Sequence, residues 1–162
     1  MGYGVIRHVY ISIQQQRLFF FRDGRCEANF KISTAKNGVG ELAGSECTPR
    51  GWHSIADIIG LDAPINTVFK ARQPTGQIYN AELEKQFPDE DWILTRIIRL
   101  AGKEIGFNQG GDCDTYNRFI YIHGCSEKTL GVPASHGCVR MSNQSVILLA
   151  ALLYDGDSVF IE

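Results

Sequence analysis

Alternating apolar and polar positions predict that most of this chain forms β-strands. Near the N-terminus, Val9, Ile11 and Ile13 share one face, as the period-two repeat of a strand requires. The dipeptide Asp23-Gly24 separates two apolar segments and is typical of a tight turn, so the chain is expected to begin as a β-meander. Strands are predicted at residues 5–13, 18–21, 26–33, 52–59, 67–71, 119–122 and 158–161.

Two segments are expected to be helical, and one is ambiguous. Residues 81–87 would form one or two helical turns. A longer helix is expected from Ser142 or Asn143, either of which can cap it, to about Tyr154. This helix is apolar almost all round, which predicts that it is buried. Residues 91–100 are rich in β-branched side chains and favour a strand, with a helix as the alternative.

Length and composition are those of one soluble globular domain. The 162 residues, of which 44% are hydrophobic and 21% charged, predict a single domain over residues 1–162. Seventeen glycines favour many turns, in agreement with a β-rich chain. Four of them lie in the stretch 36–51, which is either a connecting loop or the border of a site.

Charge and hydropathy exclude several kinds of partner. The net charge is -2 and no run of Lys or Arg stands out, so no nucleic-acid partner is expected. The apolar run 146–154 is too short for a bilayer, which takes about 20 residues, so no membrane partner is expected either. Residues 1–13 lack the unbroken apolar stretch of an export signal, which predicts a cytoplasmic protein; a trimmed signal would place the protein in the periplasm instead. A monomer is expected.

Cysteine usage points to chemistry rather than to a disulfide framework. An odd count without an export signal predicts reduced thiols. The five cysteines are Cys26, Cys47, Cys113, Cys125 and Cys138.

One tripeptide occurs twice in the last third of the chain, as His123-Gly124-Cys125 and as His136-Gly137-Cys138. A thiol becomes a good nucleophile when an imidazole accepts its proton. A glycine directly before the cysteine lets backbone N–H groups approach a developing oxyanion. The second copy lies directly before the predicted C-terminal helix, so we expect Cys138 to be the nucleophile of an acyl-transfer reaction.

The base is expected to come from another part of the fold. His136 lies two residues from Cys138, and its ring could approach the thiol only if the backbone bends sharply. His123 would end a separate strand, and triad partners are normally assembled in that way, so we favour His123. If the segment after Cys138 is extended, Arg140 projects to the same face and could hold a substrate carboxylate.

These motifs resemble one known family closely. Tyr121-Ile122-His123-Gly124, followed by Ser135-His136-Gly137-Cys138-Val139-Arg140-Met141, resembles the L,D-transpeptidase catalytic domain of the YkuD type. The stretch 34–38, the segment Thr48-Pro49-Arg50-Gly51 and the predicted C-terminal helix fit the same domain in order, so the resemblance covers nearly the whole chain.

The resemblance implies a mostly-β fold of two packed mixed sheets, with one buried helix after the catalytic cysteine and a short second helix. It implies attack of Cys138 on a peptidoglycan stem peptide between a diamino acid and a terminal D-Ala, with His123 as the base. The Gly124 carbonyl would orient the imidazole, and the N–H groups of Gly137 and Cys138 would form the oxyanion hole. The resemblance also implies a substrate-binding role for Arg140. The candidate substrate-binding residues are Tyr121, Ser135, His136 and Arg140. A muropeptide is the expected partner, and no cofactor or metal is expected.

Three alternatives stay open at this level. Cys125 stands where the family resemblance leads us to expect Thr or another small polar residue, and an oxidised Cys125–Cys138 pair is conceivable. The set His123, Cys125, His136 and Cys138 could instead hold a structural zinc ion, although a one-residue spacing within a strand is poor for zinc. The enzyme could be a cytosolic L,D-carboxypeptidase acting in muropeptide recycling, an L,D-transpeptidase, or a non-catalytic muropeptide-binding module. We favour the cytosolic L,D-carboxypeptidase, because the peptidoglycan substrates in the cytosol are soluble fragments and not a cross-linked net.

Overall fold

The computed structural model describes residues 4–162 and contains ten strands and two α-helices. The helices are α1 (Ala81–Gln86) and α2 (Asn143–Leu152), and two single 3₁₀ turns lie at Gly111–Cys113 and Glu127–Thr129. The strands are β1 (Arg7–Ser12), β2 (Arg17–Arg22), β3 (Arg25–Ser33), β4 (Gly51–Ile59), β5 (Thr67–Lys70), β6 (Gln73–Ile78), β7 (Ile93–Gly102), β8 (Tyr121–Cys125), β9 (Val139–Ser142) and β10 (Ser158–Ile161).

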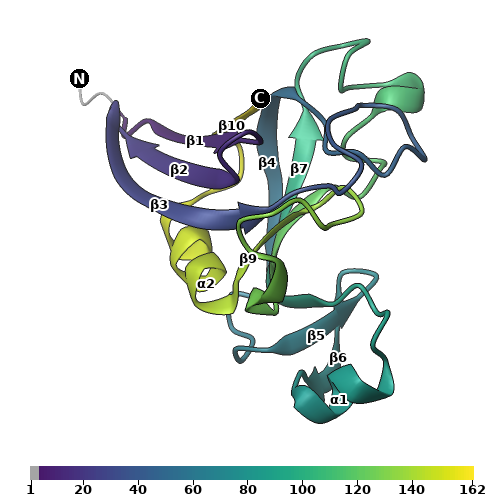
Figure 1. Ribbon diagram of the computed structural model, residues 1–162. Helices are drawn as coiled ribbons and strands as arrows, with labels where there is room; N and C mark the ends of the chain where they lie inside the picture. Colours follow the sequence, from purple (N-terminus) through teal and green to yellow (C-terminus); the bar gives the residue numbers. More distant parts are fainter. Residues whose placement is uncertain (1–3) are drawn as a thin grey trace.

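The strands form one continuous mixed sheet that closes on itself. Their order is β4-β10-β1-β2-β3-β9-β8-β7-β5-β6, and β4 also pairs with β7, which makes a ring of eight strands. The β5–β6 hairpin extends from the β7 edge and lies beside α1, below the ring in Figure 1. Among the ten strands of residues 4–162, only the pairs β1–β10 and β8–β9 run parallel. The expected mixed, mostly-β fold with two helices is confirmed, with its two sheets joined by hydrogen bonds into one.

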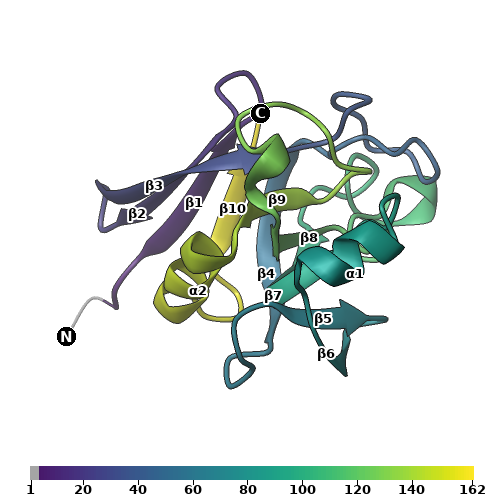
Figure 2. The same ribbon diagram turned by 60° about the horizontal axis from the view of Figure 1, so that its bottom comes forward.

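The core fills the space between the strands and α2. Its fully buried side chains include Phe20, Leu100, Ile122 and Met141, from β2, β7, β8 and β9. Ser142 caps α2 by accepting a hydrogen bond from the Ser145 N–H at 3.1 Å. Because β9 leads directly into this helix, burial of α2 fixes the chain that follows the predicted nucleophile (Figure 2).

The structure resolves one ambiguous segment in favour of the expected strand, and two other elements differ from the sequence-based expectations. The ambiguous segment is strand β7, since its period-two pairing with β4 and β8 satisfies both of its edges. Strand β6 was not predicted, because all six of its residues are exposed and give no apolar alternation. Helix α2 is buried on one side only, through Val146, Leu149 and Ala150, whereas Leu148 is 59% exposed.

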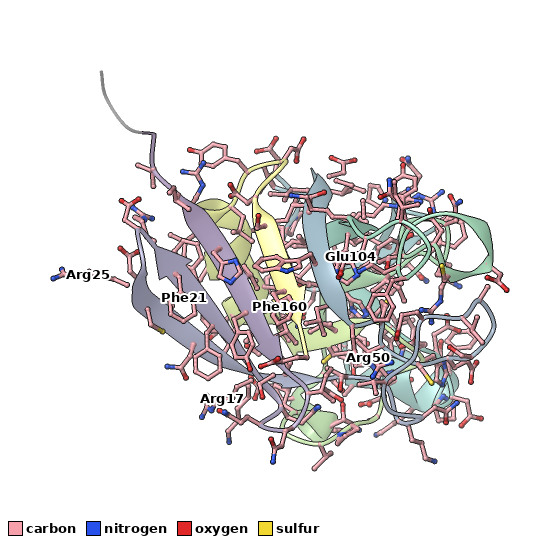
Figure 3. All side chains as sticks on the ribbon, turned by 90° about the horizontal axis from the view of Figure 1, so that it is seen from above. Arg17, Phe21, Arg25, Arg50, Glu104 and Phe160 are labelled. Atoms are coloured by element: carbon pink, nitrogen blue, oxygen red, sulfur yellow. The ribbon has the colours of Figure 1, made fainter. Side chains whose placement is uncertain are left out.

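The outer face of β1, β2, β4 and β10 carries a row of aromatic rings. Phe20 points into the core, but Phe19 and Phe21 point outward, as the alternation of β2 requires. Figure 3 shows Phe21 and Phe160 on this face, and the Phe160 ring lies 4.7 Å from that of Trp52. Among residues 4–162, no helix is long and apolar enough to cross a membrane.

Candidate active site

Strands β8 and β9 bring the two predicted catalytic residues together. The strands are parallel neighbours, with Ile122 opposite Val139 and His123 opposite Arg140. Cys138 therefore lies just before β9, alongside the start of β8. Residues that pair across neighbouring strands project to the same face, so His123 and Arg140 share a face, and Tyr121 shares it by period two.

The thiol of Cys138 is held by the backbone of the neighbouring chain. The Tyr121 N–H donates to Sγ at 3.3 Å, and the thiol lies 3.4 Å from the Phe119 carbonyl oxygen, to which it donates. Phe119 has a φ of 57°, in the left-handed region, so its backbone is held in a sparsely populated conformation beside the site. Neither contact could be read from the sequence, because both use backbone atoms.

His123 is fully buried and has one free ring nitrogen. Its Nδ1 lies 2.7 Å from the Gly124 carbonyl oxygen, which can only accept, so Nδ1 carries the proton. Nε2 is then the basic nitrogen, and it has no hydrogen-bond partner in the structure. Burial lowers the pKa of His123, which keeps the imidazole neutral and able to take a proton.

Burial raises the pKa of the Cys138 thiol to about 12. The Tyr121 N–H and the guanidinium groups of Arg140 and Arg118 act in the opposite direction, and Asp91 adds to the rise. A thiol with so high a pKa is protonated at neutral pH. The resting pair is therefore a neutral thiol and a neutral imidazole.

Two glycines permit close approaches that a side chain would block. A Cβ atom on Gly124 would lie 2.7 Å from the Leu94 carbonyl oxygen and 3.2 Å from the Thr95 Cβ. Gly137 has a φ of 133°, which favours glycine. Its N–H donates to Ser135 Oγ at 3.2 Å, so in this structure it does not point freely at an oxyanion, in contrast to its expected role.

Ser135 and the 36–51 loop support the segment that carries Cys138. The Ser135 hydroxyl donates to the Cys138 carbonyl, and the Thr48 hydroxyl donates to the Gly137 carbonyl at 2.9 Å. Arg118 binds this loop through the carbonyl oxygens of Gly40, Glu41 and Cys47 and through the Ser45 hydroxyl. The loop thus borders the site, which was one of the two interpretations of its sequence.

Arg140 lies on the expected face but is already paired with an acid. Its guanidinium donates to Asp91 Oδ1 at 2.7 Å, and His136 Nδ1 lies 3.7 Å from the other oxygen of the same carboxylate. His136 is 61% exposed and lines two adjacent cavities of about 330 and 310 Å³. Asp91 was not singled out in the sequence, because it lies 49 residues from Arg140 and belongs to no motif.

The remaining candidates are placed as follows. Tyr121 is 4% exposed, and its hydroxyl accepts a hydrogen bond from Arg72 at 3.1 Å. Cys125 is buried, its Sγ donates to the Ser126 carbonyl at 3.0 Å, and burial raises its pKa to about 12. All five cysteines are free. Within residues 4–162 the structure has no group of three or more His, Cys, Asp or Glu side chains arranged to hold a metal ion.

Comparison with known proteins identifies one family. The sequence pattern of the L,D-transpeptidase catalytic domain matches residues 6–161. No curated protein matches the chain in sequence.

Solved structures with a similar fold are themselves L,D-transpeptidases. L,D-transpeptidase 3 from Mycobacterium tuberculosis, solved with a faropenem-derived adduct, has a TM-score of 0.62 at 16% identity, over 98% of this chain and 61% of its own. An L,D-transpeptidase from Mycobacterium smegmatis has a TM-score of 0.59 at 17% identity, over 98% of this chain and 59% of its own. One from Xylanimonas cellulosilytica has a TM-score of 0.57 at 19% identity, over 100% and 63%. The chain thus spans about three fifths of the length of these structures.

Proposed function

Because this chain belongs to the L,D-transpeptidase catalytic domain family, we propose that it cleaves peptidoglycan stem peptides through an acyl-enzyme on Cys138. Water is the proposed acceptor, which makes the protein an L,D-carboxypeptidase that removes terminal D-Ala from muropeptides. The observation that supports this proposal most is the state of His123, which is buried and neutral. Its Nε2 has no hydrogen-bond partner, and the residue lies on β8, the strand next to the segment that carries the Cys138 thiol.

The reaction starts when the thiol leaves the Phe119 carbonyl and gives its proton to His123 Nε2. Sγ then attacks the carbonyl carbon between the diamino acid and D-Ala, and a tetrahedral oxyanion forms. The imidazolium returns its proton to the leaving nitrogen as the carbon–nitrogen bond breaks, which releases D-Ala and leaves a thioester. Water, deprotonated by the same nitrogen, breaks the thioester and restores the thiol.

The state of the cysteines supports water as the acceptor. All five thiols are free, including the exposed Cys26, and unpaired thiols are typical of a reducing compartment. We therefore propose a cytoplasmic location, where stem peptides are soluble recycling fragments and water is far more abundant than any acceptor amine. Fractionation of the producing cells tests this part of the proposal, and recovery from the periplasm would contradict it.

One incubation separates the proposed hydrolysis from its alternatives. Purified protein is mixed with disaccharide-tetrapeptide, and the products are analysed by mass spectrometry. We expect loss of one alanine and release of free D-Ala, with no product from the Cys138→Ala variant. Cross-linked dimers would instead show transpeptidation, and unchanged substrate would favour a binding module.

A further inference from the structure

Two arginines from separate elements lie beside the ring of Phe119 without an acidic partner. The Arg72 guanidinium carbon lies 5.0 Å from the centre of the Phe119 ring, and that of Arg99 lies 5.2 Å from the same centre. Phe119 is the residue whose carbonyl oxygen contacts the Cys138 thiol. The two positive charges therefore flank a residue that touches the reacting sulfur.

Arg99 is buried without a compensating negative charge. It is only 9% exposed, its guanidinium stacks 3.5 Å above the Tyr116 ring, and it donates to the Tyr116 carbonyl at 3.0 Å. Its Nε has no partner. A cation that is removed from water without an ion pair is costly, so such a site is ready to receive an anion.

Arg72 reaches the same place from the tip of the β5–β6 hairpin. Ala71 and Arg72 have φ values of 47° and 64°, which form a tight turn. This turn lets the Arg72 side chain donate to the Tyr121 hydroxyl at 3.1 Å. Tyr121 pairs with Arg99 across β7 and β8, so both side chains project to the face that also bears His123.

The other arginines of the site have no free capacity for a carboxylate. Arg140 is bound to Asp91 at 2.7 Å, and Arg118 uses its guanidinium nitrogens on four oxygens of the 36–51 loop. Among residues 4–162, neither Arg72 nor Arg99 lies within 4.0 Å of an acidic side chain.

We propose that Arg72 and Arg99 form the subsite for the free C-terminal carboxylate of the substrate. This inference rests on the proposed function, and it replaces Arg140 as the expected carboxylate-binding residue. The carboxylate of a terminal D-amino acid is separated from the scissile carbonyl carbon only by the amide nitrogen and one Cα. Binding of this carboxylate beside Phe119 would thus place the scissile carbonyl near the sulfur. It would also select peptides whose C-terminal carboxylate is free.

The test compares disaccharide-tetrapeptide with the same compound amidated at its C-terminus. We expect wild-type protein to have a higher kcat/KM for the free acid by about tenfold to a hundredfold. Arg72→Asn removes the charge with a residue that tolerates the left-handed turn, and should lose this preference while amide turnover changes little. Arg99→Lys keeps the charge but loses the planar contact, and should lose part of the preference for the free acid.

Arg25→Asn is the matched control. Arg25 lies at the distant β2–β3 hairpin in Figure 3, and this variant should behave like the wild type.

An equal loss on both substrates in Arg72→Asn would mean that Arg72 only positions Tyr121, and would overturn the proposal. An unchanged acid preference in that variant would overturn it as well.

A second assay separates this subsite from the proposed function. If the wild type hydrolyses neither peptide, the carboxypeptidase proposal fails, and the acylation rate of Cys138 by a carbapenem and by its methyl ester is measured by intact mass. The subsite predicts faster acylation by the free acid and loss of that difference in Arg72→Asn. If the wild type shows no acid preference in either assay, the subsite does not exist.

Discussion

Groups around the Cys138 thiol act on its pKa in opposite directions. Burial and Asp91 raise the pKa, to about 12 overall, while the Tyr121 N–H and two guanidinium groups lower it. His123 is also kept neutral by burial. A site of this kind does not hold a ready thiolate. In the proposed mechanism, Cys138 therefore gives its proton to His123 Nε2 at the moment of attack.

Alkylation by iodoacetamide tests this state directly. Between about pH 6 and pH 10, we expect modification of Cys138 to rise continuously with pH, because the thiolate fraction grows throughout this range. The exposed Cys26 serves as the internal control and should react faster than Cys138 at neutral pH. Peptide mass spectrometry gives both rates, and a plateau for Cys138 from the acidic end upward would reveal a preformed thiolate–imidazolium pair instead.

Single residues were predictable where the chemistry is local in sequence. His123, Gly124 and Cys138 stand in short motifs whose residue types suit nucleophilic catalysis. The structure places His123 and Gly124 on β8, and Cys138 directly before the neighbouring parallel strand β9. Asp91 and Arg72 were not predictable, because their contacts with Arg140 and Tyr121 span 49 residues each and depend on how the sheet closes. Arg140 alone in the sequence suggested a carboxylate site, and only the structure shows that an acid of the chain already occupies it.

At the scale of elements, strand positions followed from apolar alternation, but the contacts that shape the site did not. Strand β7 contains an irregularity between Leu94 and Ile97, where Thr95 has a φ of 74°. This irregularity faces Gly124 on β8, the residue whose carbonyl holds the His123 ring. Such bulges depend on pairing across strands, so the sequence of one strand does not reveal them.

Gly124→Ala should therefore damage both stability and catalysis. The added Cβ would meet the Leu94 carbonyl at 2.7 Å, so β8 must shift away from β7. We expect a loss of about 1–3 kcal/mol in the free energy of unfolding, together with a lower kcat, because the carbonyl that orients His123 moves with the backbone. Gly4→Ala is the control, since no atom lies within 4 Å of the position of its Cβ. Thermal unfolding and D-Ala release give the two readouts, and a Gly124→Ala variant as stable as Gly4→Ala would contradict this account.

At the scale of the whole molecule, His53 lies where the ring of strands closes, and we expect this residue to make stability depend on pH. This residue lies on β4, which joins β10 to β7, opposite Val159 on one side and Gly102 on the other. It is fully buried, and its ring contacts the Gly51 carbonyl and the Thr115 hydroxyl, each at 3.0 Å. Burial lowers the pKa of His53 to about 4.

The sign of the effect follows from proton binding. In the unfolded chain His53 has its ordinary pKa of about 6.5, so between about pH 6.5 and pH 4 the unfolded state binds more protons than the folded state. The stabilisation from the neutral ring is complete above pH 6.5 and is lost as pH falls to 4, by up to about 3 kcal/mol. His123, whose pKa is also lowered by burial, adds a loss of the same sign. Urea unfolding of the wild-type protein and of His53→Gln between about pH 4 and pH 6.5 measures the effect. Carboxylates that titrate near about pH 4 contribute equally to both proteins, so the difference between the two curves reports His53. We expect the variant to be less stable at neutral pH but to have a clearly shallower pH dependence, and parallel curves for the two proteins would show that His53 does not control acid stability.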